Sequence, residues 1–280
     1  METTSKDNQG LLLNTKLVRK LLVDFIRDEI TNAGVNRGVI GLSGGVDSAV
    51  VAYLTAEALG KENVFCVLLP YKTSSPDSLE DAKLIADTLG VRSDVIDITS
   101  IADAYIEKTS HLSNVRRGNF LARIRMVVLY DRSAREKALV VGTSNKTELM
   151  LGYGTIYGDT ACGINPLGDL YKSQVWQLAE ALGVPEHIVK KMPTADLWVG
   201  QTDEGELGFS YAEVDKLLYY MIDERRNDDE LLELGFSRTF ISKVHGLVQK
   251  NQFKRQPPTI AKISHRTVNV DFRYARDWGI

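Results

Sequence analysis

Residues 38–59 constrain the fold of this chain more than any other segment. An apolar run at 38–40 leads into the loop Gly-Leu-Ser-Gly-Gly-Val-Asp-Ser at 41–48, and a run that favours a helix follows it to Leu59. A strand, a glycine-rich loop and a helix in this order form a common frame for binding phosphate, because glycine lets the backbone approach an anion and a helix start offers free N–H groups. The segment therefore predicts an anion site at the end of a buried strand.

The loop at 41–48 differs from the Walker A pattern, which requires Gly-x-x-x-x-Gly-Lys-Ser/Thr. Ser43 and Ser48 add hydroxyl donors, whereas the carboxylate of Asp47 would repel a phosphate. Its presence is explained if a cation such as Mg²⁺ lies between the two groups. The alternative interpretation is a plain tight turn in front of a buried helix.

Strands and helices alternate along the first half of the chain. Apolar runs predict strands at 38–42, 64–69, 94–98 and 138–141, and helical periodicity predicts further helices at 16–33, 77–89 and 115–136. This alternation predicts an α/β fold with one doubly wound parallel sheet flanked by helices. The loop at 41–48 would then lie at the carboxyl edge of the sheet, where such sheets bind ligands.

The second half of the chain reads as mainly helical, without a clear linker. Helices are expected near 172–182, 185–191, 211–225, 228–234 and 238–250. We therefore expect a single domain over residues 1–280 with a helical C-terminal part. The polar stretches 70–78 and 199–208 read as mobile loops that could shield a reactive intermediate from water.

Composition argues against several classes of function. Hydrophobic residues make up 44% of the chain and charged residues 25%, as in ordinary globular proteins. A net charge of −3 argues against a nucleic-acid-binding body, and no apolar run approaches the length of a membrane span. The N-terminus has no signal-peptide core, and Cys66 and Cys162 are too few for a disulfide scaffold. We expect a cytoplasmic protein with no nucleic-acid or membrane partner.

The loop and the blocks that follow it carry a resemblance to a known family. Ser-Gly-Gly-x-Asp-Ser at 43–48 resembles the pyrophosphate loop of the N-type ATP pyrophosphatases. Later blocks are similar, in the same order, to those of NAD⁺ synthetases, and they lie at 118–126, 142–148, 157–159, 165–172, 193–197, 201–204 and 254–258. The resemblance covers residues 16–260 approximately and implies the adenine nucleotide alpha hydrolase-like fold.

The resemblance implies a ligase that completes NAD⁺ biosynthesis. ATP would adenylylate the carboxylate of nicotinic acid adenine dinucleotide, pyrophosphate would leave, and ammonia would then displace AMP to give NAD⁺. Mg²⁺ is the implied cofactor, and a homodimer is the implied assembly, with the helices at 16–33 and 115–136 as interface candidates. The short stretch before the first strand leaves no room for a glutaminase domain, so we expect free ammonia to be the nitrogen source.

The resemblance also assigns site residues one by one. The residues expected to hold ATP are Gly41, Ser43, Gly44, Gly45, Asp47, Ser48, Arg123, Thr143, Lys172 and Thr194. Those expected to take part in catalysis are Asp47, Lys172 and Arg123. Those expected to bind Mg²⁺ are Asp47, Glu148 and Asp159. Those expected to contact the dinucleotide are Asn119, Arg125, Tyr157, Asp159, Asp203, Glu204, Lys254 and Arg255.

Several of these residues have an ordinary structural interpretation as well. Glu148 alone reads as a carboxylate at a helix start, and Asp159 in Tyr-Gly-Asp reads as a turn residue. Lys172 reads as a solvated lysine, Thr194 as a cap after proline, and Arg125 as a partner in a helix salt bridge. The neighbouring blocks, rather than these residues alone, favour the functional interpretation.

Two departures and three competing interpretations remain open. Phe253 stands where many family members have histidine, and the segment 221–233 is extended relative to shorter bacterial versions. A GMP-synthetase-type amidating enzyme would share the loop but differ at 118–126 and 193–197. A tRNA-modifying thiolase would need catalytic cysteines and a basic face, and a non-catalytic nucleotide-binding module would not need to retain Asp47.

Overall fold

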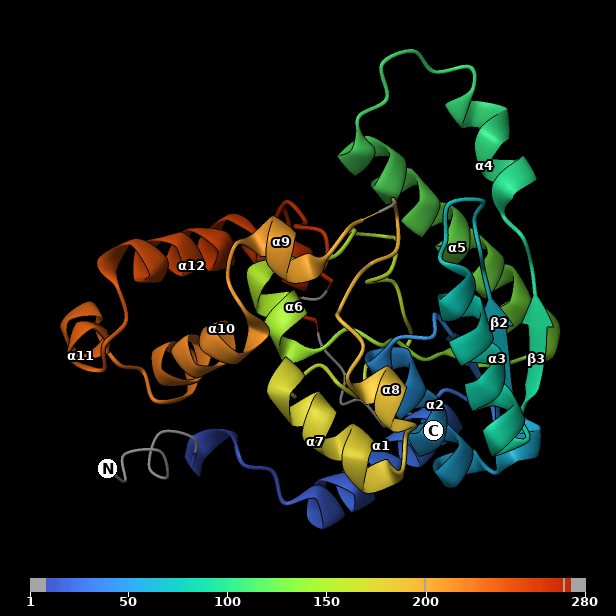
Figure 1. The fold of residues 1–280 in the computed structure, drawn as a ribbon, viewed down its shortest axis with the longest axis horizontal. Coiled ribbons are helices and arrows are strands. Elements are labelled where there is room, and N and C mark those ends of the chain that lie inside the picture. The colour runs from blue at the N-terminus through green and yellow to red at the C-terminus, as the bar shows by residue number, and fades with distance from the viewer. Residues whose placement is uncertain (1–8, 199, 269, 273–280) are drawn as a thin grey trace.

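The computed structural model describes residues 9–198, 200–268 and 270–272 (Figure 1). The strands are β1 (Gly38–Gly41), β2 (Val64–Leu68), β3 (Arg92–Val95) and β4 (Leu139–Val140). The helices are α1 (Thr15–Asn32), α2 (Val46–Leu59), α3 (Pro76–Leu89), α4 (Thr99–Ile106), α5 (Asn114–Glu136), α6 (Lys146–Leu151), α7 (Lys172–Leu182), α8 (Glu186–Val189), α9 (Asp203–Leu207), α10 (Tyr211–Leu218), α11 (Asp228–Glu233) and α12 (Arg238–Lys250).

The strands form one parallel sheet in the order β3-β2-β1-β4. Alternate side chains enter different cores, as the two-residue period of a strand requires. Ile40 packs with α1, α2 and α7 on one face, whereas Val39 and Val67 pack on the other face beside Leu129 of α5. Because both faces are covered, the central strands are apolar throughout, and the predicted doubly wound sheet is confirmed.

The order of the strands locates the ligand-binding edge. From β1 the chain moves outward through β2 to β3, and it then returns to place β4 on the other side of β1. The loops after β1 and β4 therefore leave the sheet side by side. Such a reversal opens a crevice at the carboxyl ends of the strands, which is where open α/β sheets bind ligands.

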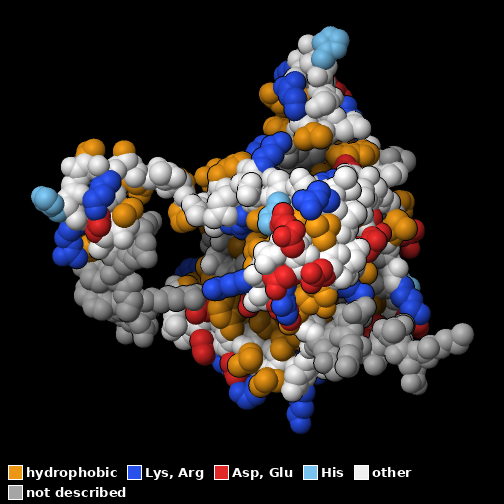
Figure 2. Space-filling model, turned by 90° about the vertical axis from the view of Figure 1, so that its left-hand side faces the viewer, with side chains coloured by type: hydrophobic (Ala, Val, Ile, Leu, Met, Phe, Trp, Pro, Cys, Tyr) orange, Lys and Arg blue, Asp and Glu red, His pale blue; other side chains and the backbone are white. Residues whose placement is uncertain are grey.

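Helices α10, α11 and α12 form a lobe that extends away from the sheet (Figure 1). Its core contains Val214, Leu217, Leu231 and Ile241, and it reaches the main body through Leu151 of α6. Figure 2 views the molecule from a neighbouring side and shows basic and acidic side chains intermingled on that face. Within the part of the chain that the structure describes, no helix is both long and apolar enough to cross a bilayer.

Several element boundaries differ from the expectation. The third strand occupies Arg92–Val95 rather than 94–98, because its backbone pairs with β2 in the register Phe65↔Arg92. The loop expected at 199–208 contains α9, which is capped by the Thr202 side chain accepting from the N–H of Gly205. The short helices α4 and α6 had no sequence prediction, because they have only 8 and 6 residues and show too little periodicity.

Candidate functional site

A cavity of about 770 Å³ lies at the carboxyl edge of the sheet. It is bounded by the loops after β1, β2 and β4, by the N-terminal half of α5, and by the segment around 191–203. The predicted site residues that line it are Gly41, Ser43, Gly45, Asp47, Ser48, Asn119, Arg125, Thr143, Glu148, Asp159, Lys172, Thr194, Asp203 and Lys254. Residues far apart in the sequence thus converge on the edge that the glycine-rich loop predicted.

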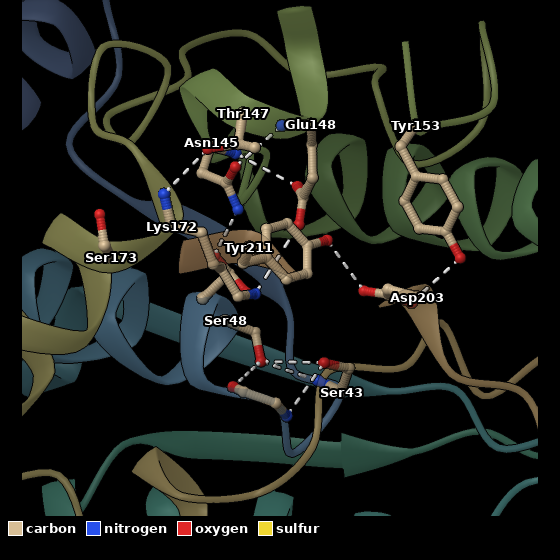
Figure 3. Close-up of polar contacts among 12 residues, drawn as sticks. Ser43, Ser48, Asn145, Thr147, Glu148, Tyr153, Lys172, Ser173, Asp203 and Tyr211 are labelled. Atoms are coloured by element: carbon tan, nitrogen blue, oxygen red, sulfur yellow. Dashed lines mark hydrogen bonds and ion pairs between the residues drawn. The ribbon is translucent and has the colours of Figure 1, made fainter. Parts of the chain in front are cut away.

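The loop after β1 is held in shape by its own hydroxyl groups (Figure 3). Ser48 Oγ accepts from the Ser43 N–H at 3.2 Å and donates to the Gly45 carbonyl at 3.0 Å. Ser43 Oγ accepts from the Gly45 N–H at 3.2 Å and lies 3.0 Å from Ser48 Oγ. The loop therefore ends in a preformed start of α2, whose first N–H groups are available to an anion.

Lys172 is the charged centre of the cavity. Its side chain is 3% exposed, and its ammonium donates to Asp47 Oδ2 and lies 3.8 Å from Glu148 Oε1. Burial acts to lower the pKa of Lys172, but Asp47 and Glu148 outweigh burial, so its pKa lies above the ordinary value. The ammonium keeps its charge, and it joins the glycine-rich loop to the first turn of α6.

Glu148 has two environments, one for each of its oxygens. Oε2 accepts from the backbone N–H of Asn145 at 3.2 Å, while Asn145 Oδ1 accepts from the N–H of Glu148 at 3.0 Å, so the two residues form a capping box on α6. Asn145 also donates to Asp47 Oδ1 at 2.9 Å. Burial, followed by the charge of Asp47, raises the pKa of Glu148 to about 8.

Asp203 lies at the start of α9 and is held by two tyrosines (Figure 3). Tyr153 donates to Oδ1 at 3.0 Å and Tyr211 donates to Oδ2 at 3.1 Å. Burial raises the pKa of Asp203, although Lys172 and both tyrosine hydroxyls oppose the shift. The predicted loop residue is thus tied to the same charged centre as Lys172.

A second polar group lies where α5 meets the segment 152–159. Asn119 Oδ1 accepts from the Thr155 hydroxyl at 2.8 Å, and Asp159 Oδ1 accepts from the Thr155 N–H at 2.8 Å. Lys254 donates to the carbonyls of Gly152 and Gly154 at 2.7 and 2.9 Å. These contacts order the part of the cavity wall that α5 and the segment 152–159 form.

Arg125 and Thr194 stabilise the two loops that border the cavity. Arg125 donates from Nε to the carbonyl of Leu69 at 3.0 Å, which fixes the end of β2 to α5. Thr194 donates to the carbonyl of Gln201 at 2.8 Å and so closes the loop in front of α9. Both side chains line the cavity while serving these contacts.

Five predicted residues are not among those that line the cavity, and these are Gly44, Arg123, Tyr157, Glu204 and Arg255. Arg123 donates to the carbonyl of Ile156 at 3.2 and 3.3 Å, and Tyr157 is 56% exposed. Glu204 accepts from the N–H of Tyr211, and Arg255 donates to carbonyls at the end of α6. Ligand contacts of these side chains stay predictions.

The donor set at the charged centre fits Mg²⁺. Magnesium in nucleotide sites is commonly held by one or two carboxylates together with phosphate oxygens. Asp47 and Glu148 both adjoin Lys172 Nζ, so their oxygens face one small volume. Among the described residues no group of three or more His, Cys, Asp or Glu side chains is placed to hold a metal, so Asp159 does not join these two carboxylates in one cluster.

Sequence reasoning missed Asn145, Tyr153 and Tyr211 as site residues. Asn145 had a readable pattern, since Asn-x-x-Glu is a helix-start signature with its side chains turned toward each other. The ring of Tyr211 lies 5.2 Å from Lys172 Nζ. Tyr211 had no local signal, because it reaches the site from a helix whose position depends on the packing of the whole C-terminal lobe.

Comparison with known proteins bears on this site as a whole. The NAD synthase family model matches residues 18–258. An NH(3)-dependent NAD(+) synthetase from Trichlorobacter lovleyi is 56% identical over 96% of this chain and 98% of its own length.

Two solved structures are also similar. The NMN synthetase from Francisella tularensis has a TM-score of 0.80 and 32% identity over 89% of this chain and 99% of its own. The NH3-dependent NAD synthetase from Campylobacter jejuni, in complex with the nitrate ion, has a TM-score of 0.77 and 41% identity over 89% of this chain and 100% of its own. The resemblance inferred from the sequence blocks is therefore confirmed, and the chain belongs to the NAD synthase family.

Proposed function

We propose that this protein amidates nicotinic acid adenine dinucleotide to NAD⁺, with ATP and ammonia as co-substrates. The observation that carries the proposal is the buried Lys172 ammonium, which is joined to Asp47 of the glycine-rich loop inside a cavity of about 770 Å³. The relative from Trichlorobacter lovleyi, matched over 98% of its length, is named for the same reaction. The reaction would be the final step of NAD⁺ biosynthesis, and the use of ATP agrees with the expected cytoplasmic location.

The proposed first step uses the glycine-rich loop. The pyrophosphate portion of ATP binds to the loop at 41–48 and the first turn of α2, where backbone N–H groups favour an anion. A carboxylate oxygen of the substrate attacks the α-phosphorus, the bond from that phosphorus to the bridging oxygen breaks, and pyrophosphate leaves. Lys172 lies where its ammonium can offset the negative charge that develops.

Asp47 and Glu148 would hold Mg²⁺, which supplies further positive charge against the phosphates. Glu148 must be ionised for this role, and its raised pKa means that metal binding would displace a proton. Asp159 is kept as a contact to substrate rather than as a third metal ligand, because among the described residues it does not form one cluster with Asp47 and Glu148.

In the second step, ammonia attacks the acyl carbon, AMP leaves with the electron pair of the acyl–oxygen bond, and one proton of the ammonia is released to leave the amide. We assign Asn119, Asp159 and Lys254 to the part of the cavity that receives the nicotinate end of the substrate. They line the cavity and are already ordered by contacts with residues 152–155. Ammonia is proposed as the direct nitrogen source because two relatives that are matched over 98% and 100% of their own length carry NH3-dependent in their names.

We also propose a homodimer. Helix α5 exposes Val115, Val127 and Tyr130, and helix α1 exposes Leu17 and Leu21, each at 41% or more. Contiguous exposed apolar patches mark surfaces that meet another subunit, and these two helices cover opposite faces of the sheet, so each would supply a separate candidate interface. Light scattering behind a sizing column tests the proposal, and a mass of one chain over the whole working concentration range would contradict it.

The first experiment supplies the purified protein with ATP, Mg²⁺ and nicotinic acid adenine dinucleotide, adding either ammonium or glutamine. NAD⁺ is measured with a coupled dehydrogenase. Formation with ammonium alone supports both the reaction and the nitrogen source, whereas equal formation with glutamine contradicts free ammonia as the direct source.

A parallel arm replaces the dinucleotide with nicotinic acid mononucleotide, since one similar structure is named an NMN synthetase. A higher kcat/KM for the mononucleotide than for the dinucleotide would contradict the dinucleotide as the proposed substrate. If the protein binds ATP but forms AMP with neither of the two substrates, the result would favour another amidating enzyme.

A further inference from the structure

Helix α7 is capped only in part by its own sequence, since the Gln174 side chain accepts from the N–H of Tyr171 at 3.0 Å while the next two N–H groups bond to other helices. The first N–H groups of a helix have no partners within it and require acceptors from elsewhere. Tyr171, the N-cap residue, gives no side-chain bond to these groups, and its hydroxyl donates to Asp223 instead. The N–H of Lys172 donates to Thr147 Oγ1 at 3.0 Å, and the N–H of Ser173 donates to Asp215 Oδ2 at 2.7 Å. The start of α7 is thus capped by side chains from α6 and α10.

These caps form one continuous chain of hydrogen bonds. The Thr147 hydroxyl accepts from Lys172 and donates to Asp215 Oδ1 at 2.5 Å. Asp215 therefore binds α6 through one oxygen and α7 through the other. Thr147 and Asp215 are both 0% exposed, so neither bond competes with water. Bonds to a charged acceptor are shorter and stronger than neutral ones.

The chain of bonds fixes the relative position of two functional side chains. Thr147 immediately precedes Glu148, and Ser173 immediately follows Lys172 (Figure 3). The residues that make the buried bonds are therefore adjacent in the chain to Glu148 and Lys172, which line the cavity. A shift of α7 against α6 would change the distance between the Lys172 ammonium and the Glu148 carboxylate, which is 3.8 Å. Asp215 is placed to prevent that shift.

Helix α10 also reaches the far end of the Lys172 side chain. Tyr211 lies one helical turn before Asp215, and its ring is 5.2 Å from the Lys172 Nζ. Its hydroxyl donates to Asp203, which fixes the ring in place. One short helix of the C-terminal lobe therefore contacts the backbone of Lys172 by way of Thr147 and its ammonium by way of an aromatic face.

We infer that Asp215 is a positioning residue for adenylylation, acting through Thr147 and the start of α7 to hold Lys172 and Glu148 in register. The inference rests on the proposed function, since it assumes that these two side chains act on ATP. It gives the helical lobe a role in the reaction even though most of the lobe lies outside the cavity. A buried carboxylate is costly to desolvate, and its two bonds to the site-bearing helices offset that cost.

The test compares Thr147→Val and Asp215→Asn with two controls. Thr147→Ser keeps the hydroxyl. Thr55→Val makes the same change at another fully buried threonine. The Thr55 hydroxyl donates to the Val51 carbonyl of its own helix at 2.7 Å, which is the bond that the structure describes for it. For each variant, kcat and KM for ATP are measured at a temperature where circular dichroism shows it folded. Binding of a non-hydrolysable ATP analogue with Mg²⁺ is titrated alongside.

Thr147→Val and Asp215→Asn are expected to lower kcat of the folded enzyme by about 10- to 100-fold, as is typical when a group that orients a site residue is lost. Thr147→Ser should restore kcat to within about threefold, and Thr55→Val should lose stability while keeping kcat within about twofold. If the two test variants instead behave like Thr55→Val, Asp215 is structural and the inference is overturned.

Failure of the proposed function is distinguishable from failure of the inference. If the wild-type protein forms no NAD⁺, the proposed reaction is wrong, and the analogue titration then decides the role of Asp215. Unchanged analogue affinity in both test variants overturns the inference, and affinity lost in Thr147→Val but kept in Thr147→Ser supports it. If Asp215→Asn does not fold, the comparison of the two Thr147 variants decides in the same way.

Discussion

Two adjacent glycines of the phosphate loop are predicted to respond very differently to alanine. Gly44 has φ = +81°, and a Cβ there would lie 2.1 Å from the backbone carbonyl oxygen of Ser78. Gly45 has φ = −90°, and its nearest contact would be Ser43 Oγ at 3.4 Å, an ordinary van der Waals distance. Gly44 is therefore required by the packing of the loop against α3, whereas Gly45 lines the cavity.

The magnitudes follow from the geometry. A left-handed backbone costs an alanine about 1–2 kcal/mol, and relieving contact with a fixed carbonyl adds about 1–3 kcal/mol of strain. A destabilisation of about 3 kcal/mol corresponds to a fall in Tm of about 5 °C for a chain of this size. In Gly45→Ala, the weaker N-cap destabilises the protein and the smaller conformational entropy of the unfolded chain stabilises it. Each contribution to the unfolding free energy is about 0.5–1 kcal/mol, so the two nearly cancel.

Differential scanning calorimetry of the two variants tests this reasoning, with ATP-analogue titration as the second measurement. Gly44→Ala should melt lower than wild type, and Gly45→Ala should melt near it but bind the nucleotide more weakly. A Tm for Gly44→Ala within about 1 °C of wild type would refute the packing argument. So would an equal loss of Tm in Gly45→Ala.

Three further outcomes are expected. Burial raises the pKa of Glu148 to about 8 from 4.5, so the folded metal-free protein binds the proton more tightly than the unfolded chain. As the pH rises from 4.5 to about 8, the unfolding free energy of the wild-type protein should therefore fall relative to that of Glu148→Gln. Urea titrations at several pH values measure this, and parallel curves would contradict it. Lys172→Met leaves Asp47 and Glu148 without their cation, so it should abolish NAD⁺ formation and lower stability by about 3 kcal/mol in urea unfolding; full activity would remove Lys172 from the mechanism. Asp196 accepts from the Ser75 N–H at 2.9 Å and joins the two loops that border the cavity. Asp196→Ala removes this acceptor and should raise KM for ATP about 10-fold, and an unchanged KM would contradict the link.

The local patterns of the chain predicted the frame of the site. Apolar runs alternating with helical periodicity predicted the parallel sheet, and the glycine-rich loop after the first strand predicted the edge at which the cavity lies. Asp47, Glu148 and Lys172 were identified through ordered blocks, and the structure brings all three together. Periodicity and loop chemistry act within a few residues, so a single sequence contains them directly.

The tertiary structure decided which partners complete the site. The sequence alone predicted a phosphate loop with two equivalent glycines, but only the approach of α3 to the loop separates Gly44 from Gly45. The sequence likewise offers no reason to connect Asp215 with Lys172, because the two residues come from different helices and are linked through Thr147. Such contacts depend on how whole elements pack, since the chain folds to bury apolar faces and the neighbours of a buried polar group follow from that packing.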